Sequence, residues 1–137
     1  MNAYAYFRLV HVVCAVLGLG LLFATALLSR SGRATAPGEL LVLSRWSSVG
    51  LVVMLLTGIA MNVSAKGLYG PQPWFGLSVA SFFVTGAVVG ITRRRLRKWI
   101  TGDVDPSLAR RFVERASWIA CALIAWITVL MELKPFS

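Results

Sequence analysis

The only histidine in the chain, His11, lies inside a long uncharged run that extends from Leu9 to Ser29. Ionisable side chains in such runs are costly to place in a lipid bilayer, and they usually face a helix bundle or a cavity. Met61 and Met131 lie near the ends of two other apolar runs, at about the depth of His11 if successive helices alternate in direction. Imidazole and thioether groups together ligate haem iron, and the same donors suit copper. The sequence therefore predicts a haem or metal site on these three residues.

Other interpretations of His11 fit the same sequence. The imidazole can be a structural group that is hydrogen-bonded to a neighbouring carbonyl or hydroxyl, or it can belong to a proton relay. Lys134 completes the set of candidate ligands, because it follows the last apolar run at the same expected end of the molecule. A lysine amine ligates a metal only after it loses its proton, so Lys134 ranks below the two thioethers.

The elements that must position these residues are apolar helices. Hydrophobic residues make up 58% of the 137-residue chain and charged residues 14%, with a mean hydropathy of +0.76, whereas soluble proteins carry about 25% charged residues. Four uncharged stretches approach the length of about 20 residues that a helix needs to cross a bilayer. We expect an all-α fold in one domain, an antiparallel bundle of four transmembrane helices at about 7–29, 44–65, 74–95 and 112–133.

The segment between the third and fourth runs carries helix stop and start signals. The basic stretch from Arg93 to Trp99 should extend the third helix beyond the lipid, and Gly102 should end it. The sequence Asp105, Pro106, Ser107 should begin the last helix.

Basic residues are distributed unevenly between the two ends of the expected bundle. Eleven flank the first and third connections, and three flank the second connection and the termini. The eleven are Arg30, Arg33, Arg45, Arg93, Arg94, Arg95, Arg97, Lys98, Arg110, Arg111 and Arg115. The positive-inside rule therefore places both termini outside, in the periplasm or the extracellular space. Because the run RRRLRK abuts an apolar helix, we expect it to bind anionic lipid headgroups and not nucleic acid.

Small residues recur at helical spacing in the apolar runs, as is typical of helices that pack within a membrane. Gly86 and Gly90 form a small-xxx-small pair in the third run, which indicates association with other membrane subunits or with a second copy of the chain. Cys14 and Cys121 fall inside apolar runs, which favours packing roles. The sequence has no phosphate-binding loop, catalytic triad or zinc-ligand spacing, so it gives no support to hydrolytic or nucleotide chemistry.

Two stretches carry a resemblance to known proteins. The first is YFRLVHVVCAVLGLG, around His11, and the second is VLMELKPF, which contains Lys134. The chain resembles a superfamily of small four-helix bacterial membrane proteins that includes the membrane-type protoporphyrinogen oxidase, copper-resistance D-type domains and uncharacterised relatives. The resemblance implies haem b carried by His11 and a role for Lys134 in activity. The stretches AVLGLG and WFGLS stand where the oxidase has Trp-Phe-Gly-Gly and Trp-x-x-x-Lys, so the chain is nearer to the uncharacterised relatives.

The residues and the resemblance together predict a haem b-binding protein of the bacterial inner membrane that serves electron transfer or porphyrin oxidation. Two alternatives stay open, a non-catalytic accessory subunit of a larger membrane complex and a copper-handling membrane domain. Whether the protein is an enzyme is also open at this point.

Overall fold

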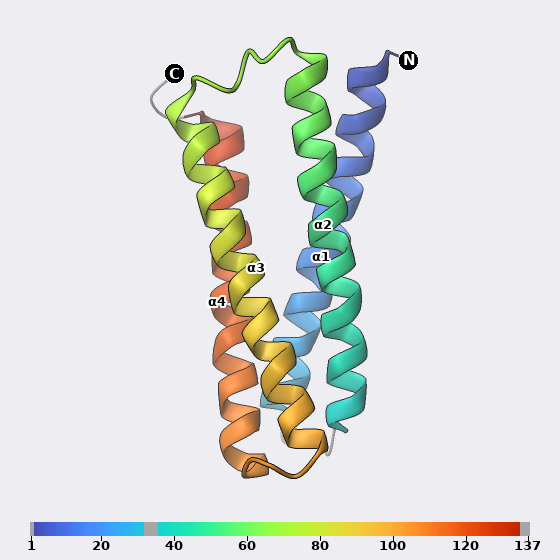
Figure 1. Cartoon of the computed structure of the whole chain (residues 1–137), viewed down its shortest axis with the longest axis vertical. Coiled ribbons are helices and arrows are strands. Elements are labelled where there is room, and N and C mark those ends of the chain that lie inside the picture. The colour runs from blue at the N-terminus through green and yellow to red at the C-terminus, as the bar shows by residue number, and fades with distance from the viewer. Residues whose placement is uncertain (1, 32–35, 135–137) are drawn as a thin grey trace.

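The computed structural model describes residues 2–31 and 36–134, which form four long α-helices packed side by side (Figure 1). They are α1 (Ala3–Arg30), α2 (Pro37–Ser64), α3 (Pro73–Ile100) and α4 (Pro106–Leu133), each of 28 residues. A helix of this length extends about 42 Å, more than the hydrocarbon core of a bilayer. All four are long and apolar enough to cross a membrane. The expected all-α fold with four membrane-type helices is therefore confirmed. Arg33, and Pro135 and Phe136 of the terminal motif, lie outside the described residues.

Local sequence signals explain where the helices begin and end. Proline occupies the first turn of α2, α3 and α4, where a missing N–H costs no hydrogen bond. At the start of α1, the Asn2 side chain accepts a hydrogen bond of 2.9 Å from the backbone N–H of Ala5. Gly102 follows α3 with a φ of 78°, a left-handed conformation that glycine adopts without strain. The predicted continuation of the third helix through Trp99 and the predicted start at Pro106 are both confirmed.

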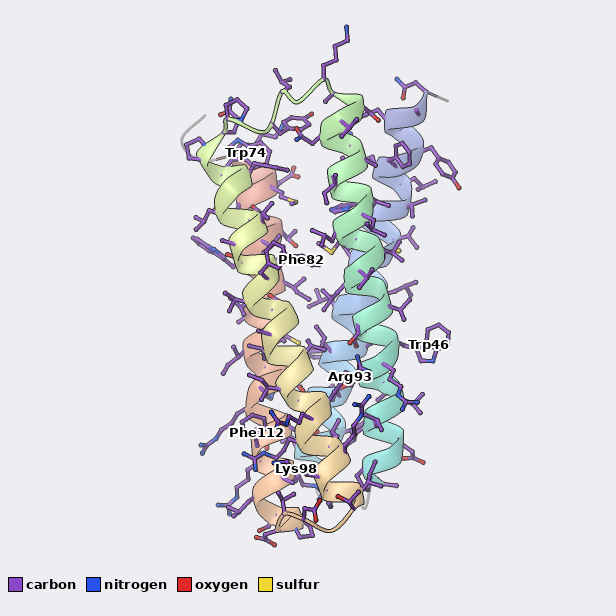
Figure 2. The ribbon with its side chains drawn as sticks, viewed as in Figure 1. Trp46, Trp74, Phe82, Arg93, Lys98 and Phe112 are labelled. Carbon is purple, nitrogen blue, oxygen red and sulfur yellow. The ribbon has the colours of Figure 1, made fainter. Side chains whose placement is uncertain are left out.

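The helices occupy the four corners of the molecule. α1 and α3 each pack against α2 and α4, so α1 lies diagonally opposite α3 and α2 opposite α4. The first turn of α1 and the last turn of α4 lie at the same end as the α2–α3 connection (Figure 1). We call this the loop end, defined by residues 65–72. The opposite end carries Arg93 and Lys98 (Figure 2), and we call it the basic end.

Apolar packing fills the basic end and the middle of the molecule. Leu40, Leu96 and Val113 are fully buried at the basic end. The middle is a cluster of Leu22, Leu51, Val89, Ala120, Cys121 and Ile124. α1 and α2 approach closely here, because a Cβ at position 50 would lie 3.6 Å from both the Cys14 carbonyl oxygen and the Gly18 Cα. His11 lies in the remaining part of the molecule, between the middle and the loop end.

Large apolar side chains are exposed along the outer surface of all four helices. Val16, Leu56 and Phe83, on three different helices, are each at least 60% exposed. Large apolar side chains in such numbers on the outside of a soluble protein would drive aggregation, whereas lipid chains solvate them without cost. The surface therefore agrees with the membrane assignment that helix length and composition indicate.

Candidate functional site

His11 is held by a threonine on the neighbouring helix. Its Nδ1 lies 2.9 Å from the Thr57 hydroxyl oxygen. That hydroxyl is also 2.8 Å from the Val53 carbonyl oxygen and 3.0 Å from the Met54 carbonyl oxygen. A hydroxyl has one proton, and the two carbonyls can only accept it. The short distances to the carbonyls favour donation by Thr57 to its own helix, in which case the hydroxyl accepts from the N–H at Nδ1 of His11.

This arrangement favours one tautomer of the imidazole, the one that carries the proton on Nδ1. With the proton on Nδ1, the lone pair of His11 is on Nε2. Besides the contact with Thr57, the imidazole has a hydrogen bond with the backbone of Met54. Metal-binding histidines have the same form, because one ring nitrogen donates a hydrogen bond and the other carries the metal. The contact with Thr57 therefore satisfies the polar group of a half-buried imidazole.

Gly58 makes room for the imidazole. A Cβ at this position would lie 3.3 Å from the Cε1 of His11 and 3.7 Å from its Nδ1. The first distance is shorter than an ordinary carbon–carbon contact of about 3.5–4.0 Å. Any larger residue at position 58 would therefore push the ring away from its place beside Thr57.

The imidazole lies on the wall of a small cavity to which all four helices contribute. Its volume is about 40 Å³, and most of its lining is apolar. Figure 2 shows Phe82 extending from α3 into the space between the helix pairs, where it forms part of the wall. The lining residues whose side chains have metal-binding chemistry are His11, Met54 and Met131. The hydroxyl of Ser78, also in the wall, donates to the Trp74 carbonyl oxygen at 2.8 Å.

The predicted site residues are brought together only in part. His11 and Met131 line the same cavity, from α1 and α4. Met61 does not line it, and Met54, seven residues earlier on the same face of α2, does. Lys134 is exposed at the end of α4, with its ammonium nitrogen 6.0 Å from the centre of the Trp74 ring, a cation–π contact. Lys134 is likewise absent from the cavity wall.

Aromatic side chains surround the site at the loop end. The hydroxyls of Tyr4 and Tyr69 are 3.2 Å apart, which joins the start of α1 to the α2–α3 connection. The Tyr69 ring lies 5.7 Å from that of Trp74, and Trp74 lies 6.0 Å from Phe75, which lines the cavity. Trp74 is 5% exposed and lies at the top of α3 (Figure 2). These contacts attach the connection to the helices beside the cavity.

Sequence reasoning missed the roles of Thr57 and Met54. Both appear at helical spacing in the second apolar run, where small and polar residues are expected to pack against other helices. A signal was available, because a histidine within the bilayer needs a hydrogen-bond partner at its own depth. Thr57 is a hydroxyl residue on the helix that follows, at about that depth.

No family model, curated protein or solved structure matches the chain. The chemistry of the cavity is therefore argued from its own residues. Within residues 2–31 and 36–134, no group of three or more His, Cys, Asp or Glu side chains converges on a common point. A metal ion at His11 would thus have one imidazole and thioethers as its ligands.

The volume of the cavity distinguishes between a metal ion such as copper and haem b, the two groups that these donors could bind. A volume of about 40 Å³ holds a metal ion or a few water molecules. A porphyrin needs a pocket of at least several hundred Å³. The cavity is therefore closer in size to a single metal ion than to a porphyrin.

Proposed function

We propose that the protein is a multi-pass protein of the bacterial inner membrane that binds copper(I) and handles it within the bilayer. The ligands in this proposal are Nε2 of His11 and the sulfur atoms of Met54 and Met131. The observation that carries the proposal is the hydrogen bond of 2.9 Å between Nδ1 of His11 and Thr57. With the proton on Nδ1, Nε2 keeps its lone pair, and His11 lines the same cavity as Met54 and Met131.

The donor set favours copper(I) over other metal ions. Thioethers are soft ligands that select Cu(I), and an imidazole adds a donor of intermediate softness. Zinc sites use thiolates, imidazoles and carboxylates, usually four in number, and calcium and magnesium prefer oxygen. Met54 is 4% exposed, so its sulfur is held away from solvent. Copper(I) also requires no charged ligand, which suits an apolar cavity.

Haem b at His11 stays a prediction from the sequence. Its support is the imidazole of His11 and the two methionines in the same cavity wall, and its difficulty is the small volume of the cavity. Among the adjacent helix pairs, α2 and α3 have the least extensive contact, so this pair would separate most easily. A visible spectrum of the purified protein distinguishes haem b from copper(I), because haem gives a Soret band and copper(I) is colourless.

A copper(I) titration under anaerobic, reducing conditions against a coloured chelator tests the proposal. We expect one equivalent to bind, and we expect Met54→Leu and Met131→Leu each to weaken binding by about tenfold or more. Met61→Leu is the matched control, because it makes the same change on α2 outside the cavity. Equal effects of Met54→Leu and Met61→Leu, or binding that survives His11→Ala, would overturn the proposed ligands.

The proposed topology places the loop end outside and the basic end in the cytoplasm. Its support is the concentration of Lys and Arg at the basic end, where Arg93 and Lys98 lie (Figure 2). The partner of this end is then the anionic headgroup layer of the inner leaflet, at about 1 kcal/mol for each basic residue near the surface.

A second candidate function is that of an accessory subunit, and one observation favours it. Gly76, Gly86 and Gly90 of α3 are exposed, and a Cβ at any of them would meet nothing within 4 Å. These three glycines therefore do not serve packing inside the molecule. A face of this kind allows another transmembrane helix to approach closely, from a larger complex or from a second copy. Co-purification in mild detergent that Gly90→Leu abolishes would support this function, and a strictly monomeric protein would refute it.

A further inference from the structure

Two buried serines differ from the other buried hydroxyl residues. Thr25, Ser47 and Thr92 each donate to the carbonyl of the residue four positions earlier, at 2.8 Å, 3.0 Å and 2.9 Å. The hydroxyls of Ser44 and Ser117 are just as deeply buried, and each residue is 2% exposed. Within residues 2–31 and 36–134, neither hydroxyl has a hydrogen-bond partner. A buried hydroxyl without a partner is costly, so both groups require one.

Both serines line the same cavity, which is separate from that of His11. It lies between the middle of the molecule and the basic end, and Thr25 and Thr92 are also in its wall. Its volume is about 10 Å³, close to the smallest space that holds one water molecule. The four hydroxyl residues come from four different helices. Ser44 on α2 and Ser117 on α4 belong to diagonally opposite helices that do not pack against each other.

The hydrogen-bonding capacities of these four groups match those of water. Thr25 and Thr92 have committed their protons to their own helices, so each offers only an acceptor oxygen to the cavity. Ser44 and Ser117 still have protons to donate. A water molecule has two protons and two lone pairs. It can therefore donate to the two threonines and accept from the two serines.

We propose that this cavity binds a single structural water molecule that joins all four helices through Ser44, Ser117, Thr25 and Thr92. The water satisfies two buried donors that direct contact between diagonal helices cannot satisfy. It also fixes the relative positions of the helices in the half of the molecule that lacks the His11 site. This inference does not depend on copper binding, because the two cavities share no residue.

A double-mutant cycle in mixed detergent micelles tests the proposal. The variants are Ser44→Ala, Ser117→Ala and the double mutant, and the measured quantity is the equilibrium constant of unfolding. Two serines that bind one water must be coupled. Each single substitution should raise the unfolding constant by a certain factor. We expect the factor for the double mutant to be about threefold to tenfold smaller than the product of the two single factors. Ser47→Ala is the control, because Ser47 is buried and donates within its own helix. It should show no coupling to Ser117→Ala.

A second measurement keeps the test independent of how well the variants fold. A high-resolution structure of the unaltered protein should show one water between the four hydroxyls. Multiplicative effects of the two substitutions would overturn the proposal, because they would mean that each serine turns to its own helix. A structure that shows other buried waters and none in this cavity would also overturn it.

Discussion

Gly58→Ala should damage the His11 site while leaving the fold intact. The added Cβ would lie 3.3 Å from Cε1 of His11, so the ring must move by a few tenths of an ångström to regain normal contact. The hydrogen bond to Thr57, now 2.9 Å, then lengthens or bends. Its loss costs about 0.5–1.5 kcal/mol. Alanine in place of glycine within a helix returns up to about 1 kcal/mol, so the free energy of unfolding should change little.

Copper affinity should respond far more than stability does. Loss of the hydrogen bond that orients a metal-binding histidine typically lowers affinity by about 10-fold to 100-fold. The matched control is Gly20→Ala on α1, where a new Cβ meets nothing within 4 Å. Chelator competition gives the affinity, and unfolding in mixed micelles gives the stability. Equal copper affinities of Gly58→Ala and Gly20→Ala would refute the role assigned to the contact between Gly58 and His11.

Two further predictions concern the hydrogen bond and the topology. Thr57→Val should lower copper affinity by about 10-fold to 100-fold, because it removes the acceptor for Nδ1. Thr57→Ser keeps a hydroxyl and should retain most of the affinity. Equal losses of affinity in the two variants would contradict the tautomer argument. In a background without Cys14 and Cys121, an impermeant thiol reagent on intact cells should label a cysteine introduced at Gly70 and not one at Ser31; the reverse pattern would invert the proposed orientation.

The fold was predictable because its causes are local. Uncharged runs show where lipid-facing helices must be, and Pro106 and Gly102 mark a start and an end through their own backbone restrictions. The helices are longer than the predicted spans, because charged residues such as those after Thr92 continue a helix outside the hydrocarbon core. Pro37 likewise begins α2 before its apolar run.

The sequence indicated at which level along the helices the candidate site would lie, but not which methionine of α2 lies beside it. Met54 and Met61 are one heptad apart on the same face of α2, so sequence periodicity cannot choose between them. The choice depends on how far α1 and α2 are shifted along each other. Gly50 packs against the backbone of Cys14 and Gly18, and this contact sets a register that brings His11 beside Thr57. Such a register is a property of two helix surfaces together.

X-ray absorption at the copper edge tests the central claim most directly. We predict that the protein loaded with one equivalent of copper(I) shows sulfur neighbours together with one imidazole nitrogen. The imidazole contribution should disappear in His11→Ala, and a sulfur contribution should disappear in Met54→Leu. A spectrum with no sulfur neighbours, or one that His11→Ala leaves unchanged, would contradict the assignment of His11 and the thioethers as the metal site.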